Sequence, residues 1–125
     1  MSYDTNNIFA KILRGEIPCD KVFENDHALA FNDISPQAKV HVLVIPKGAY
    51  IDVDDFSKNA SKDEIASLMQ AVAEVCKITK VSLIEGGNGF RLIANTGPDG
   101  SQEVPHFHYH VMGGEPMGLR GLRKN

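Results

Sequence analysis

Three histidines fall within five residues near the end of this 125-residue chain, at positions 106, 108 and 110. Alternate side chains of an extended strand point to the same face, so this spacing places the three imidazoles together if 106–112 is a strand. The intervening positions are apolar or aromatic: Phe107, Tyr109 and Val111. The pattern therefore predicts a strand with one face on the core and a histidine face lining a cleft.

Two chemistries suit such a face, metal binding and metal-free catalysis. Same-face neighbours lie about 6.7 Å apart along a strand, so three imidazoles on one straight strand do not readily meet around an ion with ligand bonds of roughly 2.1 Å. A zinc site would need help from His27, His41 or Cys19, and none of these shows a recognisable ligand spacing. We therefore expect neither a metal nor another cofactor.

Metal-free catalysis gives His108 the central role, because it alone neighbours both other histidines and can be oriented by them. A neutral imidazole, with an ordinary pKa of roughly 6.5, is a competent nucleophile toward phosphorus, and water can hydrolyse the adduct. The neighbouring histidines can supply the proton that a leaving amine or alkoxide needs. This chemistry predicts nucleotidyl or phosphoryl transfer to water, with activity falling below about pH 6 as the nucleophile becomes protonated.

Size and composition limit the scaffold that must position these side chains. A chain of 125 residues, 42% hydrophobic and 23% charged, is expected to form a single α+β domain, 1–125, with a C-terminal tail from about 115. The 13 basic and 16 acidic residues are scattered, which indicates no nucleic-acid-binding face. The start has no signal-peptide pattern and no window approaches the roughly 18 apolar residues of a membrane span, so we expect a cytoplasmic protein without a membrane partner.

Hydrophobic spacing and turn residues predict two helices and five strands. The helices are expected over 5–14 and 62–80, and the strands over 21–24, 28–32, 40–45, 90–94 and 106–112. The longer helix begins with the capping box Ser61-x-x-Glu64. Its apolar stripe comprises Ile65, Leu68, Met69, Val72, Cys76 and Thr79. Strands grouped on either side of one long helix indicate an α+β fold with a mainly antiparallel sheet.

Two glycine-rich loops differ in what they predict. The loop 86–89 lacks the Lys-Ser/Thr of a phosphate-binding P-loop and precedes a strand, so it is expected to be a turn. The loop 95–103 leads to the histidines, and Gly97 and Gly100 allow its backbone N–H groups to converge. It is therefore either an anion-binding nest or an ordinary turn.

The segment 106–112 resembles the His-φ-His-φ-His-φ-φ signature of the histidine triad (HIT) superfamily, in which φ is an apolar residue. Further segments match that family in order: Ile8-Phe9-x-Lys11-Ile12, Glu16-Ile17-Pro18, the run 30–38, His41-x-Leu43-Val44-Ile45-Pro46-Lys47, Asn95-x-Gly97 and Gly100-x-Gln102-x-Val104. The similarity covers roughly residues 6–116 and is greatest to the Hint branch, the purine nucleoside phosphoramidases.

This resemblance implies a HIT-like fold of five mainly antiparallel strands with one long and one short helix, whose sheets join across a homodimer. It also implies metal-independent hydrolysis of the P–N or acyl-phosphate bond of AMP or GMP conjugates through a nucleotidyl-histidine intermediate. By this resemblance His108 is the nucleophile, and His110 orients it and handles the proton. His106 and His41 belong to the supporting hydrogen-bond network.

The resemblance also assigns substrate-binding residues. Asp33 would bind the ribose hydroxyls, since a carboxylate accepts two hydrogen bonds from a vicinal diol, and Asn32 lies beside it. The base pocket would be lined by Phe9, Ile12, Phe31, Ile34 and Leu43. The phosphate would be held by Asn95, Gln102 and the backbone N–H groups of residues 101–104, which are Ser101, Gln102, Glu103 and Val104. From residue types alone, Ile12, Phe31 and Leu43 are more typical of a core, His41 of a buried core histidine, and Asp33 equally of a turn cap.

Two other functions stay open at this stage. One is a dinucleoside polyphosphate hydrolase of the Fhit type, although Gly113-Gly114 after the triad favours the phosphoramidases. The other is a non-catalytic module that binds a purine nucleotide and recruits a partner. Glu103 occupies the position at which animal Hint proteins carry a serine near the leaving group, so the preferred leaving group stays open as well.

Overall fold

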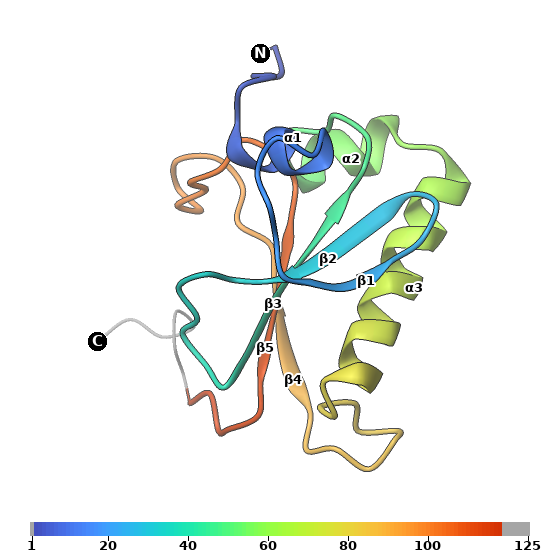
Figure 1. Cartoon of the computed structure of the whole chain (residues 1–125), viewed down its shortest axis with the longest axis vertical. Helices are drawn as coiled ribbons and strands as arrows, with labels where there is room; N and C mark the ends of the chain where they lie inside the picture. Colours follow the sequence, from blue (N-terminus) through green and yellow to red (C-terminus); the bar gives the residue numbers. More distant parts are fainter. Residues whose placement is uncertain (1, 119–125) are drawn as a thin grey trace.

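The computed structural model describes residues 2–118, which form a five-stranded sheet with three helices. The expected C-terminal tail lies outside the described residues from 119 onward. In chain order the elements are α1 (Ile8–Leu13), β1 (Lys21–Glu24), β2 (Ala28–Asn32), β3 (Val40–Pro46), α2 (Val53–Asn59), α3 (Lys62–Ile78), β4 (Phe90–Ile93) and β5 (Tyr109–Gly113). The strand order is β1-β2-β3-β5-β4, and every neighbouring pair is antiparallel (Figure 1). The predicted α+β fold with an antiparallel sheet is confirmed.

The expectation of one long and one short helix is wrong, because α2 is a third helix. Its N-cap is Asp52, whose side chain accepts a hydrogen bond from the backbone N–H of Asp55 at 2.8 Å. Only Phe56 is buried among its seven residues. One buried apolar residue gives no periodic pattern, which is why this segment does not look helical in the sequence.

The long helix α3 begins at the predicted capping box and ends at Ile78, two residues before the predicted end at 80. Its buried residues are Leu68, Ala71, Val72, Val75 and Cys76. The predicted stripe is wrong at Ile65 and Met69, whose side chains are 38% and 46% exposed. The helix packs on the sheet through the small residue Ala71 as well as through larger ones, which turns the buried face away from these two positions.

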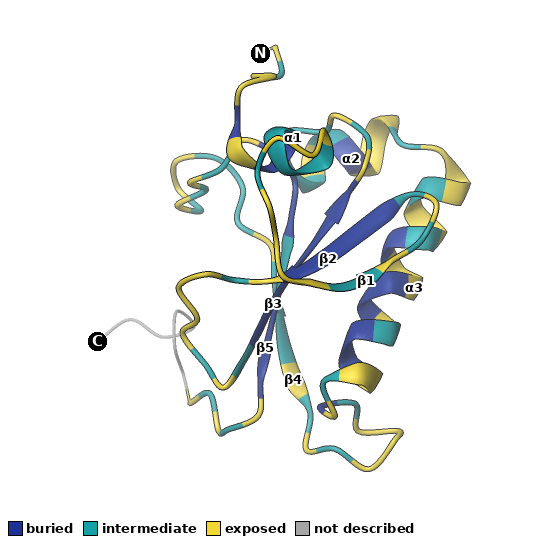
Figure 2. Cartoon of the chain, in the orientation of Figure 1, coloured by how far each residue is buried: buried dark blue, intermediate teal, exposed yellow. Residues whose placement is uncertain are grey.

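The central strands β2 and β3 are buried on both faces of the sheet (Figure 2). One face carries Ala28, Ala30, Val42 and Val44, which belong to the core cluster that includes the buried side of α3. The other face carries Leu29, Phe31, Leu43 and Ile45, which cluster with Phe9 of α1. Odd-numbered residues of β3, including His41, therefore point to the side that α1 covers.

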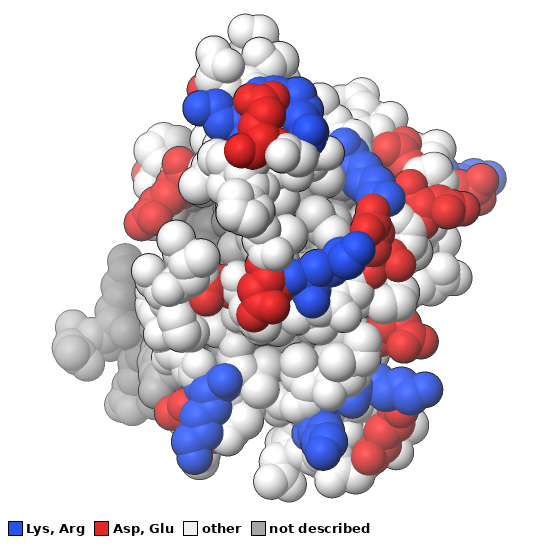
Figure 3. Space-filling model, viewed as in Figure 1, with Lys and Arg blue, Asp and Glu red and all other residues white. Residues whose placement is uncertain are grey.

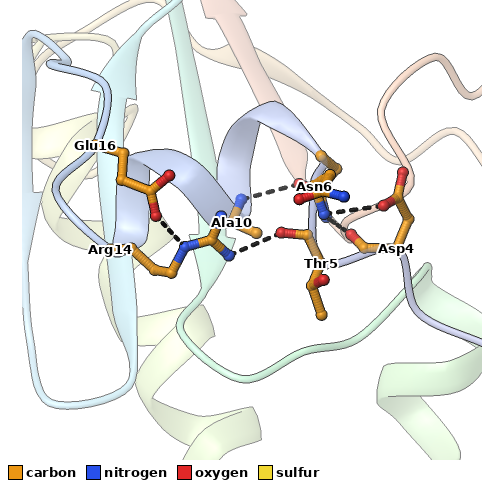
Figure 4. A network of polar contacts seen from close by, with 7 residues as sticks. Asp4, Thr5, Asn6, Ala10, Arg14 and Glu16 are labelled. Carbon is orange, nitrogen blue, oxygen red and sulfur yellow. Dashed lines mark hydrogen bonds and ion pairs between the residues drawn. The ribbon is translucent and has the colours of Figure 1, made fainter.

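A polar network holds the short helix α1 in place (Figure 4). The side chain of Asn7 caps the helix by accepting a hydrogen bond from the backbone N–H of Ala10 at 2.9 Å. At the other end of the helix, Arg14 pairs with Glu16 and donates a hydrogen bond to the backbone oxygen of Thr5 at 2.7 Å. These contacts tie the start and end of α1 together, so a helix of only six residues is ordered.

The histidine strand starts later than predicted, because β5 begins at Tyr109 and 106–108 precede it. Val44 of β3 pairs with Tyr109, so Pro46 lies opposite position 107. Proline has no backbone N–H, and the ladder of hydrogen bonds ends there. The backbone N–H of Phe107 instead donates to the backbone oxygen of Tyr50 at 2.8 Å.

Charges of both signs are interspersed on the face that Figure 3 shows. Opposite charges also pair: Lys21 and Lys47 both pair with Glu24, at 3.0 Å and 2.7 Å. This face carries no extended basic patch of the kind that binds nucleic acid. Within 2–118, no helix is long and apolar enough to cross a membrane.

Candidate active site

The pairing of β3 with β5 brings two of the predicted site histidines into contact. Leu43 of β3 lies opposite His110 of β5, and His41 is two residues away on the same face. The two rings share a hydrogen bond between Nε2 of His41 and Nδ1 of His110, at 2.9 Å. These side chains are 69 residues apart in the chain, so only the register of the sheet makes them neighbours.

A backbone N–H determines which nitrogens of these two rings carry protons. The N–H of Gln37 donates to Nδ1 of His41 at 3.1 Å, so a neutral His41 holds its own proton on Nε2. That Nε2–H is the donor to Nδ1 of His110. A neutral His110 must therefore carry its proton on Nε2, the nitrogen left free of this hydrogen bond.

His108 has the opposite tautomer. Its Nδ1 lies 2.7 Å from the backbone oxygen of His106, and a carbonyl can only accept, so Nδ1 carries the proton. Nε2 of the neutral ring then holds a lone pair. The ring is wedged edge-on between Phe9 and His110, with centroid distances of 5.0 Å to each.

His106 has no exposed surface and does not reach the cavity that the other three histidines line. Its Nε2–H donates to the backbone oxygen of Pro46 at 2.8 Å, and its Nδ1 accepts from the hydroxyl of Tyr3 at 2.6 Å. Both ring nitrogens are therefore occupied, and the residue acts on the site through its carbonyl. Sequence reasoning gave no role to Tyr3, because the two residues are 103 positions apart.

A cavity of about 240 Å³ lies beside this histidine cluster. Its lining residues are Phe9, Asp33, Ser35, Gln37, His41, Leu43, Asn95, Ser101, Glu103, Val104, His108 and His110. Ten of these were predicted as site residues from the sequence, and Ser35 and Gln37 were not. The signal for these two was their place in the turn that follows Asp33, directly before His41.

Several predicted substrate-binding residues lie outside this cavity. Phe31 is buried beneath Phe9, with ring centroids 5.5 Å apart. Ile12 lines a neighbouring groove, and Ile34 is 93% exposed. Asn32 points to the surface, where its side chain donates to Asp20 at 2.8 Å.

Gln102 holds the loop 95–105 rather than lining the cavity. Its side chain accepts from the N–H of Gly97 at 3.1 Å and donates to the backbone oxygens of Ile51 and Val104 at 2.6 Å and 3.0 Å. The backbone N–H groups of residues 100, 101 and 102 donate to oxygens of residues 96, 98 and 97. Up to residue 102 the loop is therefore an ordinary turn, and the N–H groups of 101 and 102 are not available to a phosphate as the resemblance implied.

Asp33 is the turn cap that the sequence allowed, and it also lines the cavity. One carboxylate oxygen, Oδ1, accepts the N–H of Ser35 at 2.8 Å, as a turn cap does. The other oxygen, Oδ2, lies 3.4 Å from Nε2 of His41, and the residue lines the cavity. The hydrogen bond from Ser35 thus holds the turn, and the other carboxylate oxygen faces the histidine cluster.

Burial keeps the histidines of the site uncharged at neutral pH. It lowers the pKa of His106 and of His110 to about 4, because a charged ring is poorly solvated there. Burial also lowers the pKa of His108, and the hydrogen bond to the His106 carbonyl and the charges of Asp33 and Glu103 only partly oppose it. The neutral ring that a nucleophile requires is therefore the dominant form.

One group of side chains has the composition of a metal site. Ligand atoms of Asp33, His41 and His110 lie within 4.8 Å of one another. To bind an ion, Nε2 of His41 must lose its proton, and the ring must then carry a proton on Nδ1. The N–H of Gln37 points at that same Nδ1 from 3.1 Å, so two donors would face each other. The arrangement fits a proton-sharing cluster and does not fit a metal ion.

Comparison with known proteins gives a consistent family assignment. The family model for the HIT domain matches residues 14–117. A purine nucleoside phosphoramidase of Escherichia coli K12 is 44% identical over 113 residues, 89% of each chain. An uncharacterised 13.2 kDa HIT-like protein of Azospirillum brasilense is 56% identical over 117 residues, 94% of this chain and 93% of its own. The structure of a histidine triad protein from Clostridium difficile superposes with a TM-score of 0.80 at 38% identity, covering 94% of this chain and 96% of that one. This chain belongs to the HIT family.

Proposed function

We propose that this protein hydrolyses the P–N or acyl-phosphate bond of AMP or GMP conjugates, through a nucleotidyl intermediate on His108 and without a metal ion. The observation that carries the proposal is the hydrogen bond from Nδ1–H of His108 to the His106 carbonyl, 2.7 Å long, in a ring that lines the cavity. It leaves the lone pair on Nε2 for attack on phosphorus. The 44% identity to a purine nucleoside phosphoramidase supports the same class of reaction.

The reaction proceeds in two displacements at phosphorus. First the Nε2 lone pair of His108 forms a bond to phosphorus and the P–N bond breaks. The ring then carries a positive charge, because Nδ1 keeps its proton, and the His106 carbonyl stabilises that N–H. Water next attacks phosphorus, and the bond between phosphorus and Nε2 of His108 breaks. This step releases AMP and returns a neutral ring.

The leaving amine must gain a proton, and we assign its delivery to His110. This ring lines the same cavity, 5.0 Å from His108 between centroids, and its Nε2 is free of the hydrogen bond to His41. An anionic phosphoryl group beside it favours the protonated ring, which takes its proton from solvent. The Nε2–H of His41 then turns from Nδ1 of His110 to Oδ2 of Asp33, which lies 3.4 Å away. The attacking water later returns a proton to the same ring.

The nucleoside is proposed to lie between Asp33 and the apolar wall of the cavity. The carboxylate of Asp33 can accept hydrogen bonds from the ribose hydroxyls, while Phe9 and Leu43 offer an apolar surface to the base. A homodimer with joined sheets belongs to the same proposal. Its support is that β4 lies at the edge of the sheet and Phe90 on it is 43% exposed.

Substitution of the nucleophile tests the proposal. His108→Ala should abolish turnover of adenosine 5′-phosphoramidate, whereas His27→Ala, in a turn away from the cavity, should retain it. Wild-type protein denatured in alkali during turnover, which preserves the acid-labile N–P bond, should carry an AMP-sized mass increase that the His108→Ala variant lacks. Near-native turnover by His108→Ala would refute the assignment.

Three further outcomes would each replace the proposal. Faster hydrolysis of diadenosine triphosphate than of the phosphoramidate would indicate a Fhit-type hydrolase. Binding of AMP without turnover of any conjugate would indicate a nucleotide-binding module. Stoichiometric zinc whose removal by a chelator ends turnover would overturn the metal-free mechanism.

A further inference from the structure

The candidate cavity is negatively charged before any substrate enters. Its described lining includes two carboxylates, Asp33 and Glu103, and neither a lysine nor an arginine. The histidines that line it are neutral at neutral pH, because burial lowers the pKa of each of them. The phosphoryl group of a nucleotide conjugate is itself an anion. Among such substrates, the cavity therefore favours those that also bring a positive charge.

The two carboxylates of the cavity differ in their contacts with the rest of the protein. Asp33 accepts the N–H of Ser35 at 2.8 Å and lies 3.4 Å from Nε2 of His41. Glu103 is exposed and makes no hydrogen bond or ion pair to any residue of 2–118. Its charge nevertheless acts on His108, whose protonated form it favours. Glu103 is thus a carboxylate at the candidate nucleophile with no cationic partner in the described protein.

We propose that Glu103 is a specificity-determining residue, which selects conjugates whose leaving group carries a positive charge. This inference rests on the proposed function and names the substrate class within it. With the ribose assigned to Asp33 and the phosphorus to His108, the remaining cavity wall is left for the leaving group, and that wall includes Glu103. The preferred conjugate then has one negative phosphoryl group and one cationic group, and is neutral overall.

The same charges favour release of the product. Once the bond to phosphorus is cleaved, the cationic amine departs and AMP remains with a greater negative charge than the conjugate had. Glu103 and Asp33 both lie in the cavity that AMP must leave. Repulsion between these carboxylates and the free nucleotide therefore opposes product inhibition.

Two substrates of equal shape isolate the effect of charge. The AMP phosphoramidates of 2-(trimethylammonio)ethylamine and of 3,3-dimethylbutylamine differ in one permanent positive charge. The ratio of their kcat/KM values is measured for the wild type, for Glu103→Gln and for Asp99→Asn. Asp99 is an exposed carboxylate of the same loop that does not line the cavity, so its variant is a control for the loss of one negative charge. The ratio within each variant cancels any loss of folded protein, and comparing the ratios between variants cancels the intrinsic reactivity of the two amines.

The ratio should fall roughly two- to fivefold in Glu103→Gln, as expected for an exposed ion pair, and should be unchanged in Asp99→Asn. In the wild type alone, raising the salt concentration from about 0.02 M to about 0.5 M should lower the ratio, because salt screens exposed charges. Normal turnover with the same ratio in Glu103→Gln, an equal fall in Asp99→Asn, or a ratio independent of salt would overturn this inference alone. Failure of the wild type to cleave either compound would overturn the proposed function as well.

Discussion

Acid should destabilise the folded protein, because His106 takes up a proton more readily in the unfolded chain than in its buried position. The side chain is fully buried, and both of its ring nitrogens are engaged, with Nε2–H on the Pro46 carbonyl and Nδ1 accepting from Tyr3. A proton on Nδ1 would turn that nitrogen from an acceptor into a donor and would place a charge where water cannot reach it. Burial accordingly lowers the pKa of His106 to about 4.

The sign and size of the effect follow from the two protonation states. An unfolded histidine takes up a proton near pH 6.5, whereas folded His106 does so only near pH 4. Between these values the unfolded chain binds one proton more, so the free energy of unfolding decreases as the pH falls. The contribution is fully present above about pH 6.5, and this one ring accounts for roughly 2 kcal/mol lost between about pH 7 and pH 5.

Urea unfolding at several pH values between about 5 and 7 measures this loss. The variant His106→Gln, whose amide can still donate toward Pro46, should show a slope that is shallower by roughly 0.7 proton on average in this window. The test compares how steeply the free energy of unfolding changes with pH and not its absolute value, so a general destabilisation of the variant does not hide the result. NMR titration of the wild type is an independent measure, and a His106 ring that titrates near pH 6.5 in the folded protein would refute the reasoning.

Three further substitutions or measurements test the site. Tyr3→Phe removes the hydrogen-bond donor to the buried Nδ1 of His106 and should lower the free energy of unfolding by about 1–2 kcal/mol. The control is Tyr109→Phe, whose hydroxyl has no partner within 2–118, and it should cost under about 0.5 kcal/mol. Because burial lowers the pKa of His108, the acid limb of kcat/KM should have its midpoint below 6.5, and a midpoint at or above that value would contradict the burial argument. Gly100→Ala places a Cβ 2.5 Å from the backbone oxygen of residue 96, so the turn must shift and both stability and turnover should fall, as urea unfolding and initial rates would record.

Local spacing was sufficient for most of the secondary structure. The strands 21–24 and 28–32 have the predicted bounds, and the capping box at Ser61 is where the sequence places it. These features depend on residues within a few positions of one another. Where the outcome depended on a distant partner, the local pattern was insufficient: Pro46 ends the ladder before 107, and packing on the sheet leaves Met69 exposed on α3.

The sequence by itself determined the chemistry that is available, because three imidazoles at alternate positions and an acid at a strand end are properties of residue type and order. It also identified most of the residues that meet around the cavity. The tertiary structure decided the state of each ring, since the partners of the histidines lie outside their own strands: the Gln37 N–H in the turn before His41, and the distant Pro46 carbonyl and Tyr3 hydroxyl at His106. The Gln37 N–H makes a metal ion unsuitable beside His41, and the contacts with Pro46 and Tyr3 hold His106 away from the cavity, where its carbonyl leaves the lone pair of His108 on Nε2.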